Sequence, residues 1–183
     1  SDDSDLFLKT LEGIGKTAHL YSVDMFVEKI PKTFDIVASF GLVEHFRGLN
    51  LEQVFEIHDS YLKDNGYVAI EMPNFTGFNY FWHYVFDRPD LDNHNVDVMQ
   101  PAALEWFNEN GYEVIFCDYV GVMRLWGNTG FMSNRFLAKI VAGLGVGLSK
   151  VASLLDSVGL KLRGRTWSPA LLFVARKSNL TSP

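Results

Sequence analysis

The sequence predicts a mostly parallel, doubly wound α/β sheet, and three observations support this fold class. Short apolar segments rich in β-branched residues alternate with segments of helical periodicity, the order expected of βαβ units. Of the 183 residues, 48% are hydrophobic and 21% are charged, which is enough apolar chain for a core and too much for a disordered protein. No internal repeat or second domain is visible, so we expect residues 1–183 to form a single domain.

The first half of the chain predicts two helices and three strands. Ser and Asp residues at 1–5 cap a helix that Gly13 and Gly15 end. Apolar positions recur with helical spacing from Leu49 to Lys63, and Asp64-Asn65-Gly66 forms the turn that follows. The strands are expected at His19–Tyr21, at Phe34–Ser39 and at Gly66–Met72.

The second half predicts two more strands and two helical segments. Phe75–Gln100 has no clear period and is crowded with aromatic residues, and a connection of this length is more often functional than idle. A helical insertion is expected at about residues 131–165, before the last strand. Its helix, Asn134 to Leu160, should break around Gly143–Gly147. The remaining elements are a helix at Pro101–Asn110 and strands at Glu113–Tyr119 and Ser168–Ala175.

Charge and cysteine content exclude several classes of partner. The net charge is −6 and no basic stripe is visible, which argues against a duplex nucleic-acid binder. Cys117 is the only cysteine, so an internal disulfide and a multi-cysteine zinc site are excluded. A reducing compartment, and therefore a cytoplasmic location, is the simplest expectation.

Polar or small residues follow three of the expected strands. They are Asp24, the segment Ser39–His45 and the segment Met72–Asn74. Ligands of open parallel sheets bind outside the carboxyl ends of the strands. We therefore expect these three segments to line one rim of the sheet.

The order of motifs resembles that of the class I S-adenosylmethionine-dependent methyltransferases, in the group that acts on small molecules, lipids and sugars. In this family an aspartate followed by a hydrophobic residue comes after the third strand, and Asp24-Met25 corresponds to this pair. The family's "FDxVxSxxxLEHF" pattern corresponds to Phe34–Phe46. Its "LKxGGxxxI" pattern corresponds to Leu62–Ile70, with Asn65 in place of the first glycine. The resemblance extends over nearly the whole chain, and it implies a Rossmann-like sheet, mostly parallel with the last strand antiparallel.

The resemblance fails at the front of the chain. The family opens with a Gly-rich cofactor turn and a second strand that ends in a ribose-binding acid, and neither is present here. Ser1-Asp2-Asp3-Ser4 looks like the residues just after that second strand. We therefore expect an N-terminally truncated version of the fold, without its first two strands, and weak or no cofactor binding by this chain. Phe34–Ser39 would then be an exposed edge strand through which a homodimer could form.

The resemblance also implies roles for individual residues. The cofactor, S-adenosylmethionine, would contact Asp24 and Met25 at its adenine and Phe40 and Gly41 at its methionine part. Glu44 and His45 would orient the acceptor or take its proton. The methyl acceptor, a small or lipid-like molecule, would contact the side chains of Asn74, His83 and His94. Each of these residues also has a structural alternative: a turn for Asp24, loop geometry for Phe40 and Gly41, a helix cap for Glu44 and His45, and packing for the others.

Three further patterns favour structural interpretations. The glycine spacing of a cofactor-binding turn also occurs at Gly143-Leu144-Gly145-Val146-Gly147. However, the flanking residues are predicted to be helical and no acidic residue comes directly before Gly143. Asp87, Asp90, Asp92 and His94 are irregularly spaced, so we interpret them as solvated loop charges and expect no metal site. Phe136–Leu160 is apolar but contains charged residues, which argues against a transmembrane span. A packed helix is the preferred interpretation there, ahead of a helix that lies on a membrane surface.

The leading functional hypothesis is transfer of a methyl group from S-adenosylmethionine to a small-molecule or lipid-like acceptor. The alternative is a non-catalytic, methyltransferase-like module that uses the same fold for association. A nucleotide-binding oxidoreductase of the doubly wound class is less well supported, because the Glu44-His45 turn and the final strands suit methyltransferases better.

Overall fold

The computed structural model describes residues 19, 21–125 and 134–178. The chain divides into two compact units, residues 1–32 and 33–183. In the described part of the first unit, Asp24 begins a turn in which its side chain accepts a hydrogen bond from the Phe26 amide at 2.9 Å. The expected helix at residues 1–8 lies outside the described residues. His19 and Tyr21 are not in a strand, so the strand expected there is not formed by the residues that are described.

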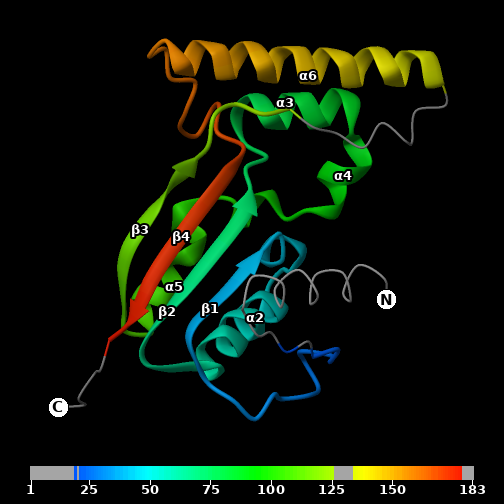
Figure 1. The fold of residues 1–183 in the computed structure, drawn as a ribbon. Coiled ribbons are helices and arrows are strands. Elements are labelled where there is room, and N and C mark those ends of the chain that lie inside the picture. The colour runs from blue at the N-terminus through cyan, green and yellow to red at the C-terminus, as the bar shows by residue number, and fades with distance from the viewer. Residues whose placement is uncertain (1–18, 20, 126–133, 179–183) are drawn as a thin grey trace. The chain divides into compact units, whose positions relative to one another are not determined.

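The second unit is built on a four-stranded sheet in the order β1-β2-β4-β3. Its strands are β1 (Phe34–Phe40), β2 (Leu62–Pro73), β3 (Tyr112–Val120) and β4 (Ala170–Lys177). β1 and β2 are parallel, while β4 runs antiparallel to both β2 and β3 (Figure 1). The prediction of a mostly parallel sheet with an antiparallel last strand is confirmed, and β1 and β3 are the two outer strands among those described.

Helices α2 (Leu49–Ser60) and α5 (Glu105–Glu109) pack on one face of this sheet. Phe107 of α5 is fully buried, and its ring centroid lies 5.0 Å from those of Phe55 in α2 and Phe173 in β4. His58 of α2 joins the helix to β1, because the Ser39 hydroxyl lies 2.9 Å from His58 Nε2. Burial lowers the pKa of His58. These contacts pack α2 and α5 against the sheet.

Phe75–Gln100, which shows no period in the sequence, is largely helical. It forms α3 (Gly77–Phe86), α4 (Arg88–Asn93) and a 3-10 turn at Val96–Val98. The helices are hard to detect because α3 is apolar on most of its surface, so no polar face marks the period. A second 3-10 turn at Pro101–Leu104 leads into α5, as expected for this segment.

The long helix α6 (Arg135–Ser157) is continuous, so the predicted break around Gly143–Gly147 is wrong. Asn134 caps it by accepting hydrogen bonds from the amides of Phe136 and Leu137. Gly145 lies in van der Waals contact with α3, and such a close approach explains a glycine within a helix. Figure 1 shows α6 alongside α3, beyond the end of the sheet where β2 leads into α3.

Candidate functional site

The loop after β1 begins at a backbone position that favours glycine. Gly41 has a φ of +62°, and its amide donates a hydrogen bond to the Glu71 carbonyl of β2 at 3.0 Å. A 3-10 turn, Val43–His45, follows directly. This geometry turns the chain back over the carboxyl ends of β1 and β2 and brings Glu44 and His45 to the rim of the sheet.

Glu44 is the most unusual side chain of this rim. It is 1% exposed, and its Oε2 atom has no hydrogen-bond partner in the part of the chain that the structure describes. Burial raises the pKa of the carboxyl, although the neighbouring His45 and His94 act in the opposite direction. Glu71 lies near enough for the Glu44 charge to raise its pKa further, in addition to the effect of burial. A buried carboxyl with an unsatisfied oxygen is costly to the fold, and such groups are often found at functional sites.

Two histidines flank Glu44. The rings of His45, in the same loop, and His94, from the end of α4, have centroids 4.6 Å apart. The ligand-type atoms of these three residues lie within 4.8 Å of one another, so together they could bind an acceptor or hold a cation. His45 is exposed, whereas only 11% of the His94 side chain is accessible. The cluster therefore has one open side.

Backbone contacts fix the two sides of the cluster to each other. The Asn95 amide donates a hydrogen bond to the Glu44 carbonyl at 2.6 Å, and the Asn95 side chain donates to the Phe46 carbonyl at 2.9 Å. Arg47 Nη2 donates to the His94 carbonyl at 3.2 Å. These hydrogen bonds therefore hold the loop after β1 against the residues that follow α4.

His83 lies behind this cluster, within α3. The ring of Phe75 lies between His83 and His94. Its centroid is 4.1 Å from that of the His83 ring and 4.9 Å from that of the His94 ring. Burial lowers the pKa of His83 to about 4, so its ring is neutral at pH 7. His83 Nδ1 lies 3.7 Å from a carboxylate oxygen of Asp87 and 3.5 Å from one of Asp90.

The interpretation of the acids at 87–92 as solvated loop charges is wrong for Asp87, which is 1% exposed. His83, Asp87, Asp90 and His94 are spaced by four, three and four residues across α3 and α4, so they occupy neighbouring helical turns. That spacing was the available sequence signal. His83, Asp87 and Asp90 also bring their ligand-type atoms within 4.8 Å of one another.

Asn74 has a structural role in this arrangement. It is fully buried, and its side-chain amide donates to the carbonyls of Arg165 and Ser168, at 2.9 and 2.7 Å. Its Oδ1 accepts hydrogen bonds from the amide and the hydroxyl of Thr76. These bonds join the end of β2 to the segment before β4 and occupy the whole side chain, so contact with an acceptor stays a prediction that the geometry does not favour.

The four predicted cofactor residues divide between the two units. Phe40 is 71% exposed at the end of β1, and Gly41 follows it at the rim, where its Cα faces Glu44. Asp24 and Met25 belong to the first unit, in which the Asp24 side chain is engaged in its own turn. Their contact with a cofactor stays a prediction.

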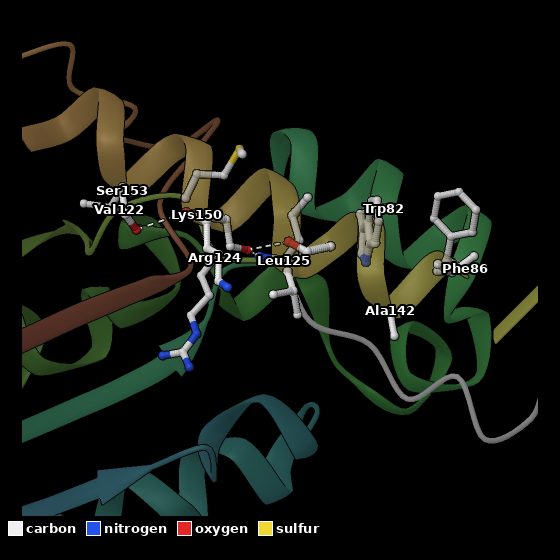
Figure 2. Close-up of a pocket in the computed structure, with 13 residues that line it drawn as sticks. Trp82, Phe86, Val122, Arg124, Leu125, Ala142, Lys150 and Ser153 are labelled. Carbon is white, nitrogen blue, oxygen red and sulfur yellow. Dashed lines mark hydrogen bonds between the residues drawn. The ribbon is translucent and has the colours of Figure 1, made fainter. Parts of the chain in front are cut away.

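A separate cavity of about 780 Å³ lies between α3, α6 and the chain from Val122 to Leu125 (Figure 2). Trp82 and Phe86 of α3 line one side, and Val141, Gly145 and Lys150 of α6 are among the residues on the other. Arg124 also borders the cavity, but its side chain points away from α6 in Figure 2. Adjacent residues of α3 thus serve different sites, with Trp82 at the cavity and His83 in the polar cluster.

The described architecture is similar to that of solved methyltransferases. A S-adenosylmethionine-dependent methyltransferase from Archaeoglobus fulgidus superimposes with a TM-score of 0.54 at 16% identity, over 93% of this chain and 80% of that one. Weaker similarities are to a sarcosine dimethylglycine methyltransferase structure from Galdieria sulphuraria (TM-score 0.49, 11% identity, 93% of this chain and 64% of that one) and to coclaurine N-methyltransferase bound to N-methylheliamine and SAH (0.38, 11%, 85% and 51%).

The sequence itself matches no protein-family model and no curated protein. The similarity to solved methyltransferases therefore concerns the fold alone. The sheet order β1-β2-β4-β3, with β4 reversed, agrees with the Rossmann-like sheet and antiparallel last strand that the resemblance implies. The second unit has a Rossmann-like methyltransferase fold.

Proposed function

We propose that the protein transfers a methyl group from S-adenosylmethionine to a small-molecule or lipid-like acceptor. The observation that carries this proposal is the buried carboxyl of Glu44 at the carboxyl ends of β1 and β2, whose Oε2 atom has no hydrogen-bond partner among the described residues, on a fold shared with a S-adenosylmethionine-dependent methyltransferase. In parallel sheets this rim is where ligands bind. Phe40 and Gly41, which precede Glu44, would lie along the methionine part of the cofactor.

Methyl transfer from this cofactor requires little chemical activation by the protein. The sulfonium of S-adenosylmethionine is already a reactive methyl donor, so the protein mainly positions the acceptor and excludes water. A carboxyl whose pKa is raised by burial is a stronger base than an ordinary glutamate. Glu44 would therefore take the proton from an acceptor hydroxyl or amine, while the exposed His45 and the neighbouring His94 orient the acceptor.

The cavity between α3 and α6 supports the lipid-like part of the proposal. Apolar side chains, among them Trp82, Phe86 and Val141, contribute most of its lining. An acceptor with an apolar portion would place that portion in this cavity. Replacing Ala142 with Trp would partly fill this space from an exposed position and should raise the KM for a lipid-like acceptor without changing the KM for the cofactor.

The deciding experiment combines calorimetry with a methyl-transfer assay on the full-length gene product. We expect binding of S-adenosylmethionine and S-adenosylhomocysteine, and transfer of a radiolabelled methyl group to extracted small molecules or lipids. Glu44→Gln should lower the transfer rate about 10²- to 10⁴-fold, as for loss of a general base, and leave the cofactor Kd unchanged. Glu52→Gln, at an exposed position of α2, is the matched control and should change neither quantity.

Two results would contradict the proposal. A full-length protein that binds neither the cofactor nor its product would favour the non-catalytic association module instead. Equal transfer rates for Glu44→Gln and the wild type would remove the proposed base while leaving the fold assignment intact.

The outer position of β1 supports a homodimer through residues 34–39. Ile36 and Phe40 lie on the strand face opposite Ser39, which contacts α2, and both are well exposed. Light scattering should show a dimer that Ile36→Lys dissociates. A wild-type monomer at all concentrations would contradict this pairing.

A further inference from the structure

The helix α6 presents three distinct stripes along its length. The first is a narrow seam of small residues, in which Val141, Gly145 and Ala152 are buried. This seam packs in one cluster with Trp82 of α3 and with Met123 and Leu125. Among the described residues, the buried contacts of α6 lie on this side.

The second stripe is apolar and exposed. Phe136, Ile140, Leu144, Val151 and Leu154 follow one another at spacings of four, four, seven and three residues, so they share one side of the helix. Each of these side chains is between 43% and 73% exposed. By length and composition α6 could cross a membrane, yet only 17% of its apolar window is buried in the protein. A continuous apolar face of this kind marks an interaction surface.

The third stripe is basic and runs beside the apolar one. On a helical projection, Lys139 and Lys150 fall next to the side occupied by Phe136 and Leu154, opposite the buried seam, and Lys150 also borders the cavity. Residues 134–165 contain six basic residues and one acid, although the whole chain has a net charge of −6. The single acid, Asp156, is paired with Arg163 at 2.9 Å. Positive charge is therefore concentrated on and just after this long apolar helix.

We propose that α6 docks the protein flat on an anionic lipid bilayer. The exposed apolar stripe would enter the boundary between headgroups and acyl chains, and Lys139 and Lys150 would reach the lipid phosphates with their aliphatic stems along the apolar stripe. The helix lies on the surface rather than across it, because its small-residue seam is already occupied by Trp82. A second copy of the chain fits this face less well, since pairing would bring two sets of unpaired lysines together.

The test is flotation of the full-length protein with vesicles of phosphatidylcholine alone and of phosphatidylcholine mixed with phosphatidylglycerol. We expect binding to the anionic vesicles only, reversed by high salt, because the lysines contribute through screened electrostatic attraction. Lys139→Glu combined with Lys150→Glu should weaken binding at least tenfold. Lys29→Glu, at an exposed lysine outside α6, is the charge control and should bind normally.

The apolar stripe is tested separately. Leu144→Gln combined with Leu154→Gln should also abolish flotation, while Leu49→Gln, another exposed leucine, should not. Because the replaced side chains are exposed, circular dichroism should show unchanged folding for all variants.

Three outcomes would overturn the proposal. The first is equal binding to neutral and anionic vesicles. The second is bound protein that only detergent removes, which would indicate a spanning helix. The third is a stable dimer that the glutamine pair dissociates, without any vesicle binding, which would assign the face to a second copy. None of these outcomes bears on whether the protein transfers methyl groups.

Discussion

Alanine substitutions at the three central glycines of α6 test its packing against α3. Gly143, Gly145 and Gly147 lie in the interior of a continuous helix, where glycine is less favourable than alanine by about 0.8–1.0 kcal/mol. A Cβ added at Gly143 or Gly147 would meet no atom within 4 Å. Gly143→Ala and Gly147→Ala should therefore each raise the free energy of unfolding by nearly the full propensity difference.

Gly145 differs because it faces Trp82. An added Cβ would lie 3.1 Å from Trp82 Cζ2 and 3.3 Å from the Leu125 carbonyl oxygen. The indole is 5% exposed and its ring centroid lies 4.7 Å from that of Phe86, so it has little room to move. Overpacking of this kind costs about 1–3 kcal/mol, which exceeds the gain in helix propensity. Gly145→Ala should therefore be destabilising by up to about 2 kcal/mol.

Urea unfolding followed by circular dichroism at 222 nm measures these changes. The midpoint should rise for Gly143→Ala and Gly147→Ala and fall for Gly145→Ala, with similar slopes. If Gly145→Ala stabilised the protein as much as its two neighbours do, α6 would not lie close to Trp82, and the buried seam on which the membrane proposal depends would be refuted.

Three further predictions concern the core and the rim of the sheet. Phe107→Ala should cost about 3–5 kcal/mol in urea unfolding, because it empties the fully buried centre between α2, α5 and β4; a loss below 1 kcal/mol would contradict that packing. Asn74→Ala should cost about 2–4 kcal/mol, since several buried hydrogen bonds lose their partner; thermal unfolding at pH 7 checks it, and an unchanged Tm would count against the structural role. Glu44→Gln should gain stability relative to the wild type as the pH rises from 4 to 8. Because burial raises the pKa of Glu44, the folded state keeps this proton at pH values where the unfolded chain has lost it. The free energy of unfolding of the wild type therefore falls with rising pH until the folded-state pKa is passed. Curves of unfolding free energy against pH that stay parallel for the wild type and Glu44→Gln would refute the burial of a carboxyl.

Regular periodicity made much of the second unit predictable. The strand Phe34–Ser39 and the helix beginning at Leu49 were located within a few residues, because a run of β-branched residues and a helical apolar spacing each have one clear local solution. The same reasoning failed for α3, whose apolar residues occupy nearly every position. It also failed for α6, where glycine was interpreted as a helix breaker but serves a close contact.

The sequence alone determined the mostly parallel α/β sheet with its reversed last strand, and it placed Gly41, Glu44 and His45 at a strand end. It could not determine that Glu44 would be buried with its Oε2 atom unpaired among the described residues, or that His94, 49 residues further along the chain, would lie beside His45. Nor could it show that the apolar side of α6 would be left uncovered. Local periodicity depends on neighbours within one helical turn or strand pair, whereas burial, pKa and exposure depend on which distant segments come to lie against a residue, and only the tertiary structure decides that.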